Sequence, residues 1–262
     1  MCRPCQEVTE TNGLVRYEAV GEVATVILDS PHNRNALSAQ LVAELTDRLG
    51  EAGADRGVRA VVLTHTGRVF CSGADLAAAG AGSLGTDTIM AVLRLIVELP
   101  KPVIARVAGH VRAGGMGIVG ACDLAVAAES ASFAFTEARI GLAPAMISLT
   151  TLDIMDPRQA ARYYLTGETF GAPVAAWLGL ITVSCSDEEL DGVVDGLVAQ
   201  IRETSPQGAA ETKKLLTAAR RQRLDAAGPE MAALSARLFA SEEAQEFIRA
   251  FLEKRAPGPP GP

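Results

Sequence analysis

Short apolar runs alternate with amphipathic stretches over the first two thirds of the chain. Five runs are almost continuously apolar, as strands covered on both faces of a sheet usually are. They span residues 23–28, 60–64, 103–107, 124–128 and 132–135. Between them, helices are predicted at residues 38–51, 88–99 and 116–122. This alternation predicts an α/β protein, and on its own it leaves a doubly wound sheet open as an alternative.

The pattern becomes helical after residue 183. Ser186 and Glu189 have the spacing of a capping box, and Ser205 and Pro206 supply a cap and a first-turn proline. The predicted helices span residues 187–203, a stretch from residue 206, residues 229–240 and residues 242–254. Several apolar side chains on the last two helices either pack against another subunit or fold back onto the core. They are Leu234, Leu238, Phe247 and Phe251.

Length and composition fit one large core with a small appendage. The chain has 262 residues, of which 48% are hydrophobic. We place the α/β core at residues 1–197 and a helical region at residues 198–262, where we expect the Pro/Gly tail to be disordered. The net charge of −7 disfavours nucleic acid as a partner.

Cysteine and histidine usage narrows the chemistry further. Five widely spaced cysteines, including Cys2 and Cys5, predict a reducing compartment without a disulfide framework. His32, His65 and His110 have no cysteine or carboxylate at ligand spacing, so we expect no metal site. We find neither a leader after Met1 nor an apolar stretch long enough to cross a bilayer, and we expect a soluble, cytoplasmic protein with no membrane partner.

Two glycine turns follow predicted buried strands. Ala113, Gly114 and Gly115 open the third predicted helix, where backbone N–H groups lack intrahelical partners. Gly73 makes a similar turn after the second predicted strand. Tight packing alone explains such glycines. They also allow two N–H donors to converge on one negatively charged oxygen, because no Cβ obstructs its approach.

Several motifs resemble the enoyl-CoA hydratase/isomerase, or crotonase, superfamily, and they follow its order over most of the chain. They are PHNRNALS at 31–38, FCSGADL at 70–76, KPVIARVAG at 101–109, AGGMG at 113–117, ACDLAVAA at 121–128 and AFLEKR at 250–255. The resemblance implies a crotonase-like spiral of ββα units with a C-terminal helical region for oligomerisation. It also implies a homotrimer, or a hexamer built as a dimer of trimers.

The same resemblance implies a substrate and a site. The substrate is an acyl thioester of coenzyme A, so coenzyme A enters as part of the substrate and no separate cofactor is expected. By position, the backbone N–H groups of Ala74 and Gly114 form an oxyanion hole for the thioester carbonyl, and Glu137 is the catalytic acid/base. The residues implied in substrate binding are Arg34, Ala36, Ser72, Asp75, Leu76 and Thr136.

One position departs from the hydratases of this family. They usually carry a second glutamate three residues past the oxyanion glycine, where this chain has Gly117, and the segment LAPAMIS at 142–148 replaces their Pro/Gly-rich stretch. Hydration with one carboxylate holds the water with less help, whereas double-bond isomerisation needs only one group to remove and return a proton. Three acids are candidates to fill the vacant place. They are Asp75, Asp87 and Glu98.

We therefore expect a hydratase of 2-enoyl-CoA thioesters with Glu137 as its acid/base. The alternatives are a Δ3-Δ2-enoyl-CoA isomerase and a CoA-binding relative that has lost catalysis. On a surface strand end beside Arg139, a glutamate is ordinarily solvated or ion-paired. Burial among Phe133, Phe135 and Met146 would instead raise its pKa into a working range.

The runs VRAGGMG and FAFTEARIGLAPAMIS resemble a branch that hydrates branched glutaconyl thioesters such as methylglutaconyl-CoA. Arg112 would then bind a second substrate carboxylate; the alternative is a surface or interface arginine. The anionic coenzyme needs local positive charge, for which Arg34, Arg68 and Lys254 are candidates. Residues 77–88 form either a lid over the acyl pocket or a plain solvent loop.

Overall fold

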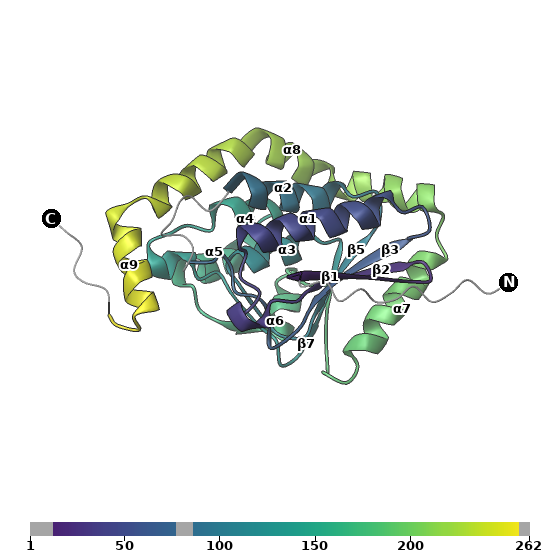
Figure 1. Cartoon of the computed structure of the whole chain (residues 1–262), viewed down its shortest axis with the longest axis horizontal. Helices are drawn as coiled ribbons and strands as arrows, with labels where there is room; N and C mark the ends of the chain where they lie inside the picture. The colour runs from purple at the N-terminus through teal and green to yellow at the C-terminus, as the bar shows by residue number, and fades with distance from the viewer. Residues whose placement is uncertain (1–12, 77–85, 257–262) are drawn as a thin grey trace.

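A central sheet lies between two layers of helices. The computed structural model describes residues 13–76 and 86–256 of the chain. Helices α1 (Ala39–Ala54) and α2 (Thr86–Glu98) cover one face of the sheet, and α7 (Leu190–Arg202) lies against the other face (Figure 1). Ser38 caps α1, because its side chain accepts a hydrogen bond from the backbone N–H of Leu41.

The central sheet has six strands in the order β1-β2-β3-β5-β7-β10. The first pair is antiparallel and the other pairs are parallel. Every residue of β3 is buried, as expected for a strand with helices on both faces. The strands are β1 (Val15–Val20), β2 (Val23–Leu28), β3 (Ala60–His65), β5 (Val103–Val107), β7 (Leu124–Ala128) and β10 (Val183–Cys185).

A smaller sheet shows how the chain repeats itself. Its order is β4-β6-β8-β9, with the last pair antiparallel. In three successive units one strand joins the large sheet, the next joins the small sheet and a helix follows, namely β3-β4-α2, β5-β6-α3 and β7-β8-α4. This repetition confirms the predicted ββα spiral. The added elements are β4 (Val69–Cys71), β6 (His110–Arg112), β8 (Ser132–Ala134), β9 (Phe170–Gly171), α3 (Gly114–Ala121) and α4 (Ala145–Thr151).

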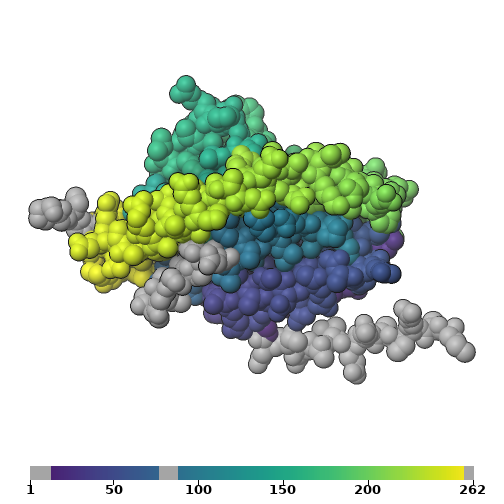
Figure 2. Space-filling view, turned by 90° about the horizontal axis from the view of Figure 1, so that it is seen from above, coloured from purple at the N-terminus to yellow at the C-terminus, as the bar shows by residue number. Residues whose placement is uncertain are grey.

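The C-terminal region begins with one long helix, α8 (Pro206–Phe239), where two had been predicted. Figure 2 shows this helix lying along α2 and leading to α9 (Glu242–Leu252) at one end of the molecule. The predicted helix start at residue 229 is wrong. Pro229 lies inside α8, which stays continuous because buried residues on both sides of the proline, such as Leu224 and Ala232, pack against neighbouring helices.

Most other helix boundaries shift by one to three residues from the sequence prediction, and two differences concern residues singled out above. Ser186 and Glu189 do bond to each other, with the Ser186 hydroxyl 2.9 Å from Glu189 Oε2, but the helix begins three residues later than predicted, at Leu190. The strand predicted at residues 132–135 is β8, which ends at Ala134, so Glu137 does not lie at a strand end. It begins the short 3₁₀-helix η3 (Glu137–Ile140) instead.

The remaining helices are η1 (Pro31–Asn33), α5 (Pro157–Thr166) and α6 (Ala172–Trp177). Of the predicted loop at 77–88, residues 77–85 lie outside the described residues, while residues 86–88 begin α2. Cys2, Cys5 and the tail beyond residue 256 also lie outside them. A search of the described helices finds none with the length and apolar character needed to span a membrane.

Candidate active site

All nine residues predicted for the site line one cavity of about 700 Å³. The small sheet, the N-terminus of α3, η3 and the helices α4, α8 and α9 supply its walls. The nine are Arg34, Ala36, Ser72, Ala74, Asp75, Leu76, Gly114, Thr136 and Glu137. Segments far apart in the sequence therefore meet at one place in the fold.

The two glycine turns touch each other at this cavity. Gly73 has a φ of +91°, and a Cβ on it would lie 2.6 Å from the Cβ of Ala113. A Cβ on Gly114 would lie 2.7 Å from Leu37 Cδ1 and 3.7 Å from the Cα of Gly73. Glycine is required at both positions, and this close approach brings the backbones of Ala74 and Gly114 to the same wall of the cavity.

The neighbouring backbone groups are bonded, whereas two N–H groups are not. Leu37 N–H donates to Gly73 O over 2.8 Å, and Ala113 N–H donates to Ala134 O over 3.1 Å. Within the described residues, no hydrogen bond uses the backbone N–H of Ala74 or of Gly114. Gly114 is the first residue of α3, where an N–H has no intrahelical partner. Both donors are therefore available to a ligand in the cavity.

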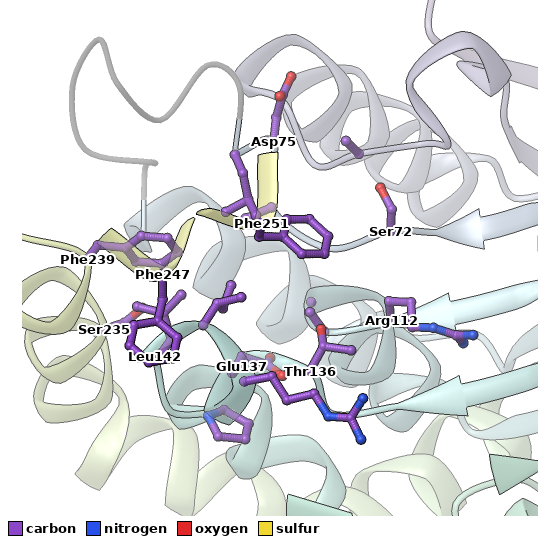
Figure 3. A pocket seen from close by; sticks show the side chains of 18 of the residues that line it. Ser72, Asp75, Arg112, Thr136, Glu137, Leu142, Ser235, Phe239, Phe247 and Phe251 are labelled. Carbon is purple, nitrogen blue, oxygen red and sulfur yellow. The ribbon is translucent and has the colours of Figure 1, made fainter. Parts of the chain in front are cut away.

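Glu137 supplies the titratable group of the site. Its Oε2 atom is buried and has no hydrogen-bond partner within the described residues. Burial raises the pKa of this carboxyl from its ordinary value of 4.5 to about 7, against a smaller opposing effect of its own backbone. Figure 3 shows Glu137 and Thr136 together at the cavity wall. A carboxyl that titrates near neutral pH can both accept and return a proton.

The predicted apolar neighbours of Glu137 are two buried aromatic side chains and one methionine. Phe133 and Phe135 are fully buried, and the ring of Phe135 lies 4.2 Å from that of Tyr164. The pKa of Tyr164 is raised mainly by burial and also by the charge of Glu137, which places the phenol within electrostatic reach of the carboxyl. Met146, the third predicted neighbour, lines the cavity.

The place of the missing glutamate is filled. A Cβ on Gly117 would lie 2.5 Å from Ile147 Cγ2 and 2.9 Å from Ile147 Cβ, so α4 leaves no room for a side chain there. The hydroxyl of Thr150 on α4 also donates to the carbonyl of Gly117 over 2.9 Å. The two sequence departures, at Gly117 and in the LAPAMIS segment, are therefore two sides of one packed contact between α3 and α4.

The three candidates to replace the glutamate missing at Gly117 differ in where they lie. Glu98 lies on α2 in an ion pair with Arg94, with 3.0 Å between Oε1 and Nη1, and does not line the cavity. Asp75 lines the cavity, but its side chain points away from Glu137 (Figure 3). The side chain of Asp87 lies outside the description. Within the described residues, Glu137 and Asp75 are the acidic side chains of the cavity wall.

Arg112 is neither a free surface side chain nor free to grip a substrate carboxylate. Its guanidinium donates to the backbone oxygens of Val111 and Ser132, over 2.9 and 2.7 Å, and to the Ser132 hydroxyl over 2.8 Å. Figure 3 shows it directed away from Glu137. Arg112 lines the cavity but ties β6 to β8.

Of the three cations predicted to bind the coenzyme, only one lines the cavity. Arg34 lines the cavity beside Ser72, whose backbone N–H donates to Arg34 O over 3.1 Å, while Arg68 and Lys254 are outside the cavity lining. No group of three His, Cys, Asp or Glu side chains with the arrangement of a metal site occurs among residues 13–76 and 86–256.

Six wall residues from the C-terminal helices were not predicted as part of the site. They are Ser235 and Phe239 on α8 and Phe247, Ala250, Phe251 and Leu252 on α9. Phe247 and Phe251 had been identified only as apolar positions with two possible destinations. Their spacing of four residues, which places both on one helix face, was the available signal. Both line the cavity of their own chain, and Phe251 is 58% exposed there, so packing against another subunit stays a prediction.

The ββα spiral, with its two adjoining glycine turns and one buried carboxyl, defines the class of crotonase-fold enzymes. The sequence model of the enoyl-CoA hydratase/isomerase family matches residues 18–258, and the chain belongs to that family.

Known proteins agree with this assignment. The crystal structure of an enoyl-CoA hydratase from Mycobacterium avium is 52% identical, has a TM-score of 0.88, and the match covers 94% of this chain and 99% of that one. The mitochondrial enoyl-CoA hydratase domain-containing protein 3 of Danio rerio is 29% identical, over 95% of this chain and 88% of its own length. The hydroxycinnamoyl-CoA hydratase-lyase of Pseudomonas fluorescens is 32% identical, over 73% of this chain and 74% of its own length.

Proposed function

We propose that this protein hydrates the double bond of a 2-enoyl-CoA thioester, with Glu137 as the single acid/base and the N–H groups of Ala74 and Gly114 as the oxyanion hole. The observation that carries the proposal is the buried Oε2 of Glu137 in the same cavity as two backbone donors, all three without a hydrogen-bond partner among the residues that the structure describes. Relatives named as enoyl-CoA hydratases support the choice of reaction.

The proposed reaction balances with one carboxyl. Ionised Glu137 takes a proton from water while the water oxygen bonds to the β carbon, and the electrons of the double bond move onto the thioester oxygen. The N–H groups of Ala74 and Gly114 stabilise this enolate, and one such donor typically lowers a barrier by about 3 to 4 kcal/mol. The protonated Glu137 then delivers its proton to the α carbon, which regenerates the carboxylate and releases a 3-hydroxyacyl thioester.

The coenzyme is proposed to enter along the segments that carry Arg34, Ala36 and Ser72. Arg34 is exposed at this end of the cavity, where a cation favours the phosphates of the ligand. Asp75 and Leu76 follow the oxyanion residue Ala74 directly, so the remaining contacts are formed largely by main chain. Such contacts hold a thioester arm without depending on particular side chains.

Crotonyl-CoA and 3-methylglutaconyl-CoA test the reaction. Hydration removes the conjugated double bond, so the expected result is a steady loss of ultraviolet absorbance together with formation of the 3-hydroxyacyl product. The substrate that turns over faster identifies the acyl preference. No loss of absorbance with either thioester contradicts hydration as the main activity.

A Δ3-Δ2-enoyl-CoA isomerase is the second candidate, and the contact between Gly117 and Ile147 favours it. Isomerisation moves a proton from C2 to C4 through a dienolate, and Glu137 alone can remove and return it. Nothing in this reaction requires a second carboxyl to hold water. Incubation with a 3-enoyl-CoA tests it, because isomerisation creates the conjugated absorbance that hydration removes.

A further inference from the structure

The cavity has two chemically different ends, with Glu137 between them. Figure 3 shows Ser72 on one side of Glu137 and a group of mostly apolar side chains on the other. This second group, which we call the acyl-end wall, consists of Leu142, Ser235, Phe239 and Phe247. Because the exposed cation Arg34 lies at the Ser72 end, the acyl-end wall faces the part of a ligand that lies beyond the reacting atoms.

Ser235 is the polar exception in the acyl-end wall. It lies on the buried face of α8, is only 5% exposed, and lines the cavity. Within the described residues its hydroxyl makes no hydrogen bond, not even to the backbone one turn earlier, although Thr217 on the same helix makes such a bond over 2.8 Å. The Ser235 oxygen is not one of the fully buried atoms without a partner, so it is open to the cavity, where it can bond to water or to a polar group of a ligand.

Apart from Arg34, which lies at the Ser72 end, the arginines of the cavity bond to other parts of the protein, which argues against a charged acyl group. Arg112 donates to β8, and Arg139 donates to the carbonyl of Thr166 over 2.9 Å. Arg255 is paired with Glu246 over 2.8 Å and with Glu253. A substrate carboxylate at the acyl-end wall would therefore meet apolar side chains and one neutral hydroxyl.

We propose that the acyl-end wall binds an aryl group carrying a hydroxyl, and that Ser235 is the hydrogen-bond partner of that hydroxyl. Phe239 lies one turn after Ser235 on α8, Phe247 lines the same end of the cavity (Figure 3), and flat apolar groups pack well beside such rings. The inference rests on the proposed function, since it takes Glu137 to mark the reacting atoms of an acyl thioester. It makes Ser235 a residue that determines specificity and not a catalytic one.

Saturated probes separate this inference from the proposed reaction, because they bind but have no double bond to hydrate. We would measure the Kd of 3-phenylpropanoyl-CoA and of its 3-hydroxyphenyl and 4-hydroxyphenyl forms by calorimetry. One hydroxylated probe is expected to bind about fivefold more tightly than the phenyl probe, as one buried neutral hydrogen bond allows. In Ser235→Ala this ratio should fall to about one, while the Kd of the phenyl probe stays within about twofold.

Two further variants control the result. Ser184 on β10 also has a buried, unpartnered hydroxyl within the described residues but lies outside the cavity, so Ser184→Ala should keep the fivefold preference. Phe247→Ala should weaken the phenyl probe and leave butanoyl-CoA unaffected, because only the aryl group reaches that ring.

Equal Kd values for all three aryl probes in the unmodified protein overturn the inference, as does a preference that survives Ser235→Ala. Aryl probes that bind more weakly than butanoyl-CoA also overturn it. An unmodified protein that turns over no enoyl thioester but shows the Ser235-dependent preference contradicts the proposed function and leaves the subsite standing.

Discussion

Gly114 and Gly117 lie one turn apart on α3, and their surroundings differ completely. Gly114 lies at the open first turn, where its N–H has no partner within the described residues and faces the cavity. Gly117 lies under α4, where Ile147 occupies the space that any side chain would need. Packing requires glycine at both positions, against Leu37 at Gly114 and against Ile147 at Gly117, but the two differ in that Gly114 also presents an N–H that is unpartnered within the described residues.

Two walls of the cavity, one carrying Glu137 and the other Ile147 above Gly117, differ in the same way. The Glu137 wall holds a carboxyl whose pKa is raised to about 7 and whose Oε2 is unpartnered within the described residues. The Gly117 wall presents the apolar side chain of Ile147 to the cavity. The proposed function places proton transfer at the wall that holds Glu137, and changes to each wall test it.

Glu137→Gln should have the largest effect. Removing the only acid/base of the proposed reaction is expected to lower kcat by about 10² to 10⁴, because glutamine has the same shape but cannot carry the proton. Loss of crotonyl-CoA absorbance measures the rate, and the Kd of saturated butanoyl-CoA should change less than about twofold. The exposed Glu129 provides a matched control, and Glu129→Gln should leave both values unchanged. Undiminished turnover in Glu137→Gln would contradict the proposal that Glu137 is the acid/base.

The oxyanion turn should be the next most sensitive feature. In Gly73→Ala the new Cβ would lie 2.6 Å from Ala113 Cβ, so the turn must shift, and kcat should fall by about 10²-fold as the donors of Ala74 and Gly114 separate. Gly21→Ala is the control, since Gly21 also has a positive φ, of +60°, but a Cβ there meets nothing within 4 Å. Both variants carry similar backbone strain, so equal losses of activity would attribute the effect to strain alone.

Because Glu137 is buried, the free energy of unfolding should decrease as the pH rises. Because the folded-state pKa of about 7 exceeds the ordinary value of 4.5, the protein favours the protonated carboxyl. The associated stability is fully present below about pH 4.5 and is lost as the pH rises through 7, by roughly 3 kcal/mol at most. Glu137→Gln has no charge to bury, so its Tm should exceed that of the unmodified protein by several degrees at pH 8 and match it near pH 4.5. A Tm difference independent of pH contradicts the shifted pKa.

Much of the fold followed from the apolar pattern because buried strands are short, continuous and flanked by turns. The predictions at 23–28, 103–107 and 124–128 have the bounds of β2, β5 and β7. The strand β1 was not predicted, since its outer residues are exposed and its pattern is weak. The continuity of α8 through Pro229 could not be predicted from local signals, because packing on both sides of the proline maintains it.

Part of the site could likewise be predicted from the sequence, and part could not. Motif positions predicted the nine residues that share the cavity, because closely spaced turns fix where backbone groups point. The contact between Gly117 and Ile147 joins residues 30 positions apart, and the acyl-end wall draws on the segment after η3, on α8 and on α9. Contacts between residues so far apart in the sequence depend on how the helices pack, and a local sequence pattern does not predict that packing. The sequence showed that a glutamate was missing, but only the structure shows what replaced it.

The smallest expected effect concerns the packed contact between Gly117 and Ile147. Gly117→Glu alone should fold poorly, because its side chain overlaps Ile147, and overpacking of this kind costs about 1 to 3 kcal/mol before the buried charge is added. Combining it with Ile147→Gly opens the space, and the ratio of hydration to isomerisation should then rise about tenfold over Ile147→Gly alone, since a second carboxyl can hold water. Gly192→Glu on α7, where a Cβ meets nothing within 4 Å, should change neither stability nor ratio. Normal stability of Gly117→Glu would contradict the packed contact. An unchanged ratio in a well-folded double variant would instead show that Glu137 alone sets the reaction, and that Ile147 excludes nothing the chemistry needs.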